Sequence, residues 1–440
     1  MRYLVESGDF PGAREAARSC RAEPWWCHAL EGFAAHAARD YGAAEAAFDR
    51  ALGMMDSTQR CEWTDVRVLL PLGPTRGLEP LTCEARARWA HHRWALADPL
   101  WSVPGNDRRT EHFARYMMSE LERVSRSPYH LAWGKDSHEL MLRYGWPERW
   151  SRRPASGIDR GDVNVVGHEP HPAFQFFPGD SGLLTPERVT QGDWDLRPAD
   201  AVNRYAPAYA GVALTLPAQV VRFARGDSLL LVTAVEPPID TAFDAAIATW
   251  SVATRDTSGA IAVRAWGPRV ATTTMARTTR WVSIEALDSV HRAVARHRLA
   301  LPEVGVPGLI LYRDPRPDDA SLASVLPRML PGARVRQPEP LGLYWEYDAG
   351  GARDSVAHVI SVYPRSARWL TRLARTLRLA EAAAPVHLRV SEPPSSAAIP
   401  SRALALDLSG LDPGVYDLRV RIEVAGETVG DVMRTLTVTR

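Results

Sequence analysis

Lysine is almost absent from this chain. Lys135 is the only lysine, so 52 of the 53 basic residues are arginine. A phosphate-binding P-loop needs a Gly-Lys-Ser/Thr sequence after its glycine-rich turn, and the residues around Lys135 lack that glycine spacing. Kinase-type nucleotide binding and Schiff-base chemistry on pyridoxal phosphate also require a placed lysine. The sequence excludes these classes of enzyme, and we expect no cofactor.

An excess of one charge and a long apolar run are also missing. The 53 basic and 52 acidic residues leave a formal net charge of +1, so no basic field is available to replace the counterions of a nucleic acid. No apolar run approaches ~18 residues, the length of a membrane-spanning helix. We therefore predict no nucleic-acid partner and no transmembrane segment. The 440 residues, 45% of them hydrophobic and 24% charged, indicate a folded protein of several domains.

Cysteine is confined to the first fifth of the chain, at Cys20, Cys27, Cys61 and Cys83. An even number of clustered cysteines predicts two local disulfides, Cys20–Cys27 and Cys61–Cys83. Free buried thiols and a zinc site are the alternatives. Zinc is disfavoured because the chain has no Cys-x-x-Cys pair. Disulfides would place the protein outside the cytosol.

Two segments near the N-terminus repeat with a period of about 31 residues. Residues 8–13 (Gly-Asp-Phe-Pro-Gly-Ala) match residues 39–44 (Arg-Asp-Tyr-Gly-Ala-Ala), and a Leu-Glu-Gly-Phe segment precedes the second copy. The pattern resembles the tetratricopeptide repeat (TPR), in which a small residue lets two antiparallel helices pack closely and an aromatic ring fills the gap. It departs from that repeat in its period, which should be about 34, and in Glu31, which replaces the usual leucine. The resemblance implies a TPR-like helical domain over residues 1–97.

The first copy of this repeat lacks most of its first helix. We therefore interpret the start of the chain as incomplete, which would also account for the lack of a signal peptide before residue 8. The predicted location is extracytoplasmic, in the periplasm or the envelope. A cytoplasmic location is the alternative.

A second motif covers residues 98–150. A helix with an Asp-Pro, an Asn and a Glu-His-x-x-Arg sequence leads to Trp-Gly-Lys-Asp at 133–136 and to Arg-Tyr-Gly-Trp-Pro-Glu at 143–148. This order resembles the GWxTD domain of uncharacterised bacterial proteins. The Gly-Trp order is inverted here, Ser137 follows Asp136 where Thr-Asp is usual, and Glu148 replaces the last Asp. The resemblance implies a secreted or envelope-associated bacterial protein and no particular activity.

This motif brings together the densest polar cluster of the sequence. Its candidate residues are Glu111, His112, Arg115, Trp133, Asp136, Arg143, Tyr144 and Trp146. We interpret them as a latch between the helical and β halves, because Glu111 and Arg115 are four apart on a helix and the aromatic residues can bury area while bonding a partner. The alternative is an active site in which His112 and Asp136 exchange protons near Arg143.

Beyond this motif the sequence changes character. Residues 151–210 are rich in Pro, Gly and Asp, which is typical of a linker or loop-rich connection. Alternating apolar residues then predict a first series of strands at 211–216, 220–225, 228–235, 245–253, 260–266, 280–287 and 293–299. A second series is predicted at 308–312, 341–347, 355–362, 386–390, 403–408, 415–425 and 427–438. We assign the two series to two antiparallel β-sandwiches, at 211–304 and 305–440.

The second sandwich has an immunoglobulin-like signature. Residues 411–418 read Leu-Asp-Pro-Gly-Val-Tyr-Asp-Leu, a turn followed by a strand that is common in bacterial immunoglobulin-like modules. Tyr416 resembles the corner tyrosine of that fold. A short basic helix is expected at 366–379.

Three short motifs have ordinary structural interpretations. Gly-Asp-Ser-Gly at 179–182 is similar to the nucleophile loop of trypsin-like proteases, but no barrel carrying His and Asp precedes it, so we predict a turn. His-Glu-Pro-His at 168–171 holds three metal-capable side chains, and its prolines favour a loop over a metal site. Arg225-Gly226-Asp227 is the adhesion tripeptide, and Gly-Asp is also what a hairpin turn requires. We predict no catalytic residue and no bound metal.

The predicted fold class is multi-domain α + β, with N-terminal TPR-like helical repeats followed by antiparallel, immunoglobulin-like β-sandwich modules. Both kinds of module present binding surfaces, and no catalytic set accompanies them. The predicted function is therefore protein–protein interaction or scaffolding in the bacterial cell envelope, with an unidentified protein as partner. An enzyme of unrecognised class, built on His112, Asp136 and Arg143, is the alternative.

Overall fold

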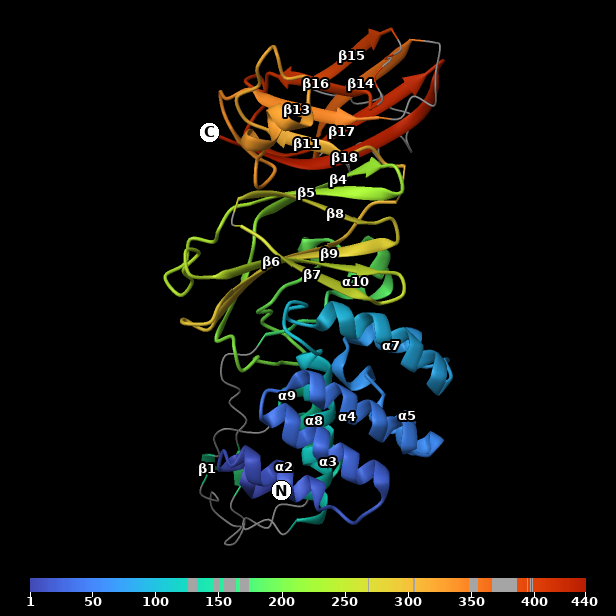
Figure 1. Ribbon diagram of the computed structural model, residues 1–440, viewed down its shortest axis with the longest axis vertical. Helices are drawn as coiled ribbons and strands as arrows, with labels where there is room; N and C mark the ends of the chain where they lie inside the picture. The colour runs from blue at the N-terminus through green and yellow to red at the C-terminus, as the bar shows by residue number, and fades with distance from the viewer. Residues whose placement is uncertain are drawn as a thin grey trace. The chain divides into compact units, whose positions relative to one another are not determined.

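The computed structural model describes residues 1–125, 133–145, 151–153, 164–166, 174–267, 269–303, 305–347, 355–365, 386–393, 395, 397 and 399–440. The chain is helical toward its N-terminus and rich in strands toward its C-terminus, which confirms the predicted mixed α + β class (Figure 1). Its residues group into two compact units. Unit 1 consists of Met1–Thr215, Ile239–Ala265 and Arg280–Ala300, and unit 2 consists of Leu216–Pro238, Trp266–Thr279 and Leu301–Arg440.

Helices form the first part of unit 1. Those described are α1 (Arg2–Glu6), α2 (Phe10–Arg18), α3 (Pro24–Ala37), α4 (Tyr41–Met54), α5 (Ser57–Trp63), α6 (Leu72–Leu78), α7 (Cys83–Ala97), α8 (Asp107–Val124), α9 (Lys135–Tyr144) and α10 (Asp180–Leu184). Side-chain caps mark several starts, since Asp9, Asp40 and Asn106 accept hydrogen bonds from backbone N–H groups of the first turn of α2, α4 and α8. No helix within the described ranges combines the length and apolarity needed to cross a bilayer.

The helices share one apolar core. Where α3 packs against α4, a Cβ added to Gly32 would lie 2.8 Å from the Phe48 ring, so only glycine allows this approach. The Phe48 and Phe113 rings are 5.4 Å apart, and those of Trp63 and Tyr116 are 4.5 Å apart. These contacts place α8 at the centre of the helical layer, against α3, α4 and α5.

Two disulfides join neighbouring helices. Cys20, just after α2, is bonded to Cys27 in α3 with a Cα–Cα distance of 5.5 Å. Cys61 in α5 is bonded to Cys83 in α7 with a Cα–Cα distance of 5.6 Å. This is the pairing that the spacing of the cysteines predicts.

The second part of unit 1 is a sheet of strands in the order β3 (Val212–Thr215), β10 (Ala293–Ala300), β9 (Thr279–Asp288), β6 (Thr249–Asp256) and β7 (Ile261–Ala265). β3 pairs parallel with β10, whereas β10 with β9 and β6 with β7 are antiparallel. β7 is the last strand of this sheet. A separate short pair, β1 (Ser151–Arg153) and β2 (Asn164–Val166), is antiparallel.

Residues 174–210 belong to the core of unit 1, although the sequence favours a linker. Their regular structure is limited to α10 and the short 3-10 helices η2 (Pro186–Arg188) and η3 (Gln191–Asp193). They nevertheless bury Phe174, Phe176 and Trp194 against strand residues such as Trp281. Their Pro and Gly content shapes irregular backbone, and their aromatic residues supply the apolar area that fastens this backbone to the sheet.

A buried ion network attaches the loop 98–106, between α7 and α8, to the sheet. The Glu285 carboxylate accepts the backbone N–H groups of Trp101 and Ser102 at 3.0 and 2.9 Å. Arg298, fully buried, forms an ion pair with Glu285 at 3.1 Å and donates to the Asp98 carbonyl at 2.6 Å. Because each charged group is bonded within a dry environment, the loop is held in one position.

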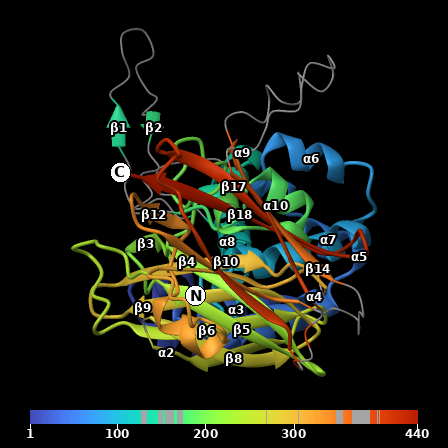
Figure 2. The ribbon, with the colours of Figure 1, turned by 90° about the horizontal axis from the view of Figure 1, so that it is seen from above.

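Unit 2 consists mainly of antiparallel sheets. The first is β4 (Ala218–Arg225), β5 (Ser228–Val235) and β8 (Val270–Ala276); the second is β11 (Leu309–Tyr312), β13 (Leu341–Glu346) and β16 (Ser401–Leu406). The third has the order β12 (Arg334–Arg336), β18 (Glu427–Thr439), β17 (Gly414–Val424), β14 (Val356–Pro364) and β15 (Val386–Glu392), with β12 parallel to β18. Figure 2 shows the long β17–β18 hairpin in red. A short helix, α11 (Leu322–Val325), follows β11.

Two apolar clusters hold unit 2 together. Trp345 on β13 and Leu418 on β17 lie in one core, so the second and third sheets pack face to face. Phe223 on β4 and Ile310 on β11 lie in the other core. The hydroxyl of Tyr416 donates to the Asp412 carbonyl at 2.7 Å and fixes the turn before β17.

The strands of residues 211–304 are divided between the units, where the sequence analysis assigns them to one sandwich. β3, β6, β7, β9 and β10 build the sheet of unit 1, and β4, β5 and β8 belong to unit 2. The reason is burial: Val221 and Phe223 of β4 cover Ile310 and Tyr312 of the following segment. The helix expected at 366–379 lies outside the described residues.

Candidate functional site

Within the predicted polar cluster, Glu111 and Arg115 of α8 are each engaged in several hydrogen bonds. Glu111 accepts from Arg115 Nε at 2.5 Å and is bonded to His36 Nε2 at 2.7 Å. Arg115 also donates to the carbonyls of Leu142 and Arg143 at 3.1 Å each, and to that of Arg204 at 2.9 Å. Burial acts to raise the pKa of Glu111, but Arg115 and His36 outweigh it and hold that pKa below its ordinary value. We call Glu111, Arg115 and His36 with these carbonyls the Arg115 latch.

His112 faces the core instead of this latch. It is fully buried, and its Nε2 is 3.0 Å from the Trp63 carbonyl, which can only accept. Burial, followed by the positive charge of Arg108, lowers the pKa of His112 to about 3. The ring is therefore neutral at pH 7 and donates its Nε2 proton to Trp63.

Asp136 and Arg143 have other surroundings. Asp136 lies exposed in the first turn of α9, and Arg143 forms an ion pair with Glu139 at 2.7 Å. Within the described ranges, no hydrogen bond or ion pair joins His112, Asp136 and Arg143 to one another. The structure thus brings together Glu111 and Arg115 but not the three residues of the alternative active site.

Trp133 links α9 to α8 at the edge of the helical core. Its ring is half-buried, and its Nε1 donates to Ser119 Oγ at 2.8 Å. The same hydroxyl is 2.7 Å from His138 Nδ1. Tyr144 is half-buried at the end of α9, and Trp146 lies outside the described residues.

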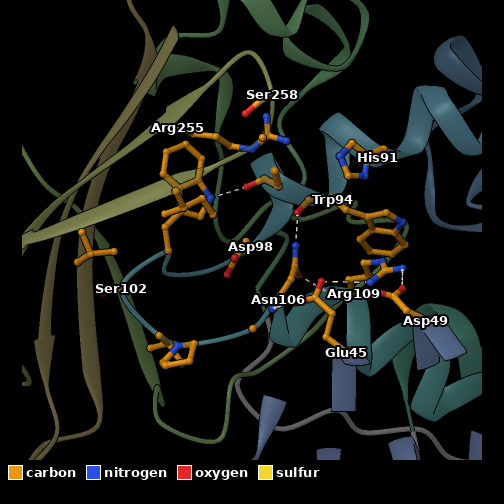
Figure 3. Close-up of a pocket in the computed structure, with 18 residues that line it drawn as sticks. Glu45, Asp49, His91, Trp94, Asp98, Ser102, Asn106, Arg109, Arg255 and Ser258 are labelled. Carbon is orange, nitrogen blue, oxygen red and sulfur yellow. Dashed lines mark hydrogen bonds and ion pairs between the residues drawn. The ribbon is translucent and has the colours of Figure 1, made fainter. Parts of the chain in front are cut away.

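A different part of unit 1 contains an open pocket. A cavity of about 640 Å³ lies between α4, α7, the start of α8, the loop 98–106 and the β6–β7 hairpin (Figure 3). None of the candidate residues chosen from the sequence lines it. Its polar lining comes from Glu45, Asp49, His91, Asp98, Ser102, Asn106, Arg109, Arg255 and Ser258. Its apolar lining includes Trp94, Trp101, Ile261 and Val263.

On one side of the pocket two acids share one arginine. Arg109 on α8 forms ion pairs with Glu45 and Asp49 on α4 at 3.1 and 2.5 Å. The Asn106 side chain donates to the Trp94 carbonyl at 2.8 Å and accepts from the Arg109 N–H at 2.8 Å. These bonds, visible in Figure 3, tie the start of α8 to α4 and α7. Both acids are thus occupied by Arg109.

Asp98, at the start of the loop, is the third acid in the pocket lining. Its side chain is buried, and its Oδ1 has no hydrogen-bond partner within the described residues. Burial, reinforced by the nearby Asp107, raises the pKa of Asp98 well above its ordinary value. Burial thus disfavours the charged form of the Asp98 carboxyl group.

Arg255, on β6, is the exception in the pocket. It is only 4% exposed, yet no carboxylate or hydrogen-bond acceptor pairs with its guanidinium in the described part of the chain. Its guanidinium lies 5.3 Å from the centre of the Trp281 ring. Burial lowers the pKa of Arg255, which an unpaired buried cation is expected to show. Figure 3 shows Arg255 beside Ser258, with His91 across the space.

Gly259 keeps the space between Arg255 and His91 open. A Cβ on Gly259 would lie 3.1 Å from Nη2 of Arg255 and 3.8 Å from Nε2 of His91. Both nitrogen atoms therefore border the same small volume. The φ angle of Gly259 is +95°, which also favours glycine at this position. Burial and the nearby Arg255 lower the pKa of His91, so its ring is neutral at pH 7.

The outer wall of the pocket is an exposed strand. All five residues of β7 are exposed, including Ile261 (43%) and Val263 (45%). Ile261 is the cross-strand neighbour of Arg255, and Val263 that of Ala253, so these four share one face of the sheet. As β7 ends its sheet, its outer backbone groups pair with no strand of the described chain.

The short motifs of the sequence take part in local structure. Ser181 lies in α10, where its hydroxyl donates to Asp193, so the protease-like segment is a helix start. Gly226 lies in the β4–β5 turn, and Arg225 forms an ion pair with Glu346 at 2.6 Å. The segment 168–171 lies outside the described residues. In the described ranges, no three His, Cys, Asp or Glu side chains are placed to hold a metal ion.

Comparison with known proteins yields no family. No protein-family model and no curated protein matches this chain. Red sea bream transglutaminase aligns with a TM-score of 0.18 and 11% identity over 51% of this chain and 31% of its own. A Salmonella alpha-2-macroglobulin reacted with methylamine aligns with a TM-score of 0.17 and 9% identity over 54% of this chain and 16% of its own. The chain spans less than a third of either protein, and similarity at this level assigns it to no family.

Proposed function

We propose that this chain is a non-enzymatic binding protein that holds an extended segment of a protein partner in the unit 1 pocket and along β7. The observation that carries the proposal is that β7, the last strand of its sheet, exposes the apolar residues Ile261 and Val263 at the wall of that pocket. Exposed hydrophobic edge strands are normally shortened, charged or covered, since they pair with other chains. An edge of this kind beside a pocket suits β-strand addition, in which main-chain bonds give affinity and pockets give specificity.

The pocket is built to keep its shape without a ligand. Glu285 and Arg298 hold the loop 98–106 by buried bonds, and Arg109 joins α8 to α4. Gly105, with a φ of +81°, lets this loop approach so closely that a Cβ would lie 2.5 Å from the Gly42 nitrogen. A preformed site loses little conformational entropy on binding, which favours recognition over catalysis by induced closure.

The modules fit a scaffold of the bacterial envelope. The close packing of Gly32 and Phe48 supports a TPR-like helix pair, and the hydrogen bond of Tyr416 to Asp412 supports an immunoglobulin-like module in unit 2. The paired cysteines support an extracytoplasmic location. The GWxTD-like motif remains a proposal for residues 98–150. The enzyme alternative gains no support from the separate partners of His112, Asp136 and Arg143.

A displayed library of short linear peptides tests the binding function. We expect the wild-type chain to enrich a set of peptides, and Val263→Arg to weaken their binding about ten-fold or more by placing a charge on the apolar wall. Ala262→Arg is the matched control, because Ala262 is exposed on the same strand but on the opposite face. Enrichment no greater than that of Val263→Arg would contradict the proposal.

A further inference from the structure

Arg255 is buried without a hydrogen bond or an ion pair in the described residues, which costs free energy. A buried cation is stabilised by a bonded carboxylate or by several acceptors. Among the described residues Arg255 has only the Trp281 ring beside it and the charge of Asp256 nearby, and it forms no hydrogen bond or ion pair. Buried polar groups are almost always hydrogen-bonded, so an exception at the wall of a pocket indicates that a ligand completes it.

The acids near Arg255 are all engaged elsewhere. Asp256 Oδ1, next in the chain, accepts from the Ser258 hydroxyl at 2.7 Å and from the Ser258 and Ala260 N–H groups at 2.9 and 3.0 Å. Glu45 and Asp49 are paired with Arg109. Asp98 is buried, which disfavours its charged form, and it forms no ion pair with Arg255 in the described residues. In the described residues no acid therefore forms an ion pair with Arg255, and its N–H donors remain for a group from outside.

We infer that a carboxylate of the bound segment lies over Gly259, where it accepts hydrogen bonds from the guanidinium of Arg255 and from Nε2 of His91. The two donors border one open space, and arginine suits a carboxylate because its planar donors match both oxygen atoms. Ile261, the cross-strand neighbour of Arg255, places this charge next to the apolar wall. The inference rests on the proposed function and names what the site selects: an extended segment with apolar residues and one carboxylate.

The peptides enriched by the wild-type chain test this inference. We expect them to share an Asp, a Glu or a free C-terminus at one fixed distance from an apolar residue. Arg255→Met should weaken their binding about ten-fold or more, and Arg255→Lys should restore part of it, because lysine keeps the charge but loses the fork. Arg264→Met is the matched control, since Arg264 is exposed on the same hairpin and on the opposite face. Thermal unfolding of each variant verifies that it is folded.

Synthetic peptides then identify the carboxylate. In one set of peptides the C-terminus is amidated, and in a second set Asp or Glu is replaced by Asn or Gln. We expect one of these changes to make the affinity of the peptide insensitive to Arg255→Met. If no peptide is enriched above the Val263→Arg variant, the proposed function fails. If peptides bind the wild type and Arg255→Met equally, or carry no shared carboxylate, the binding function stands and this inference is overturned.

Discussion

Two arginines of unit 1 are buried to a similar extent, and their surroundings are opposite. Arg115, 6% exposed, donates to Glu111 and to three backbone carbonyls. Arg255, 4% exposed, has an aromatic ring beside it and no acceptor among the described residues. A network whose members are all satisfied rigidifies a fold, whereas an unsatisfied buried group is where a ligand gains most. The comparison separates a structural cluster from a candidate binding site.

The largest expected effect concerns His112, on the closed side of this comparison. Its pKa is about 3 in the fold against an ordinary 6.5, so between these values the unfolded chain binds more protons. The free energy of unfolding should therefore fall as pH drops through this window, by as much as ~5 kcal/mol.

Chemical denaturation of the wild type and of His112→Gln at several pH values measures the contribution of His112 to the free energy of unfolding. The glutamine amide can still donate to the Trp63 carbonyl, and the carboxyl groups titrate equally in both proteins. The free energy of unfolding of the wild type should fall relative to that of the variant, by as much as ~5 kcal/mol, as pH falls from about 7 to about 3. Parallel profiles would show that His112 is not a buried neutral group.

Removing the Arg115 guanidinium should cost ~3–5 kcal/mol, because Arg115→Met removes the ion pair with Glu111 and the bonds that Arg115 donates to three buried carbonyls. The measurement is the free energy of unfolding. Arg143→Met is the control, since Arg143 pairs with the half-exposed Glu139 and should cost less than ~1 kcal/mol. Equal losses in the two variants would argue against a latch.

Trp133 should contribute less than a fully buried aromatic residue. Trp133→Ala should cost ~2 kcal/mol, below the range of complete burial, because the ring is half-buried. Trp133→Phe keeps most of the packing and loses the bond to Ser119, so it should cost ~1 kcal/mol. Thermal unfolding of both variants decides this. A loss for the phenylalanine variant as large as that for alanine would assign the effect to the hydrogen bond alone.

The smallest expected effect sharpens the comparison most. Arg255→Met should change the free energy of unfolding by less than ~1 kcal/mol in either direction, because an apolar side chain of similar length removes an unpaired buried charge. Chemical denaturation of Arg255→Met and Arg115→Met, side by side, measures the two free energies of unfolding and tests this contrast. A loss as large as that of Arg115→Met would mean that Arg255 has a structural partner.

The sequence predicts local features of this fold well. The strand expected at 228–235 is β5 with the same bounds, and the N-terminal helices follow their Asp and Asn caps. β8 was missed, because Ala-Thr-Thr-Thr in its centre offers no apolar alternation to detect. Without β8 as the partner of β5, nothing in the sequence separates β4 and β5 from the strands of unit 1. Which strands share a sheet depends on burial between residues far apart in the chain.

The candidate sites show the same limit. The pairing of Glu111 with Arg115 follows from their helical spacing, and the structure contains it. The part played by His36 does not, since it comes from a helix far upstream. Arg255 had no signal at all: in the sequence it lies beside Asp256 between the strands expected at 245–253 and 260–266. Its place on β6, and the turn that occupies Asp256, appear only in the structure.

The division into units has a consequence for how the protein is made. The chain passes from one unit to the other after Thr215, Pro238, Ala265, Thr279 and Ala300. No single cut or truncation therefore yields either unit whole. Both disulfides lie within the first 83 residues, whereas the loop 98–106 is held by residues of β9 and β10 far downstream. The helices alone therefore form only part of the pocket lining. The pocket is complete only when the chain as far as Ala300 is present.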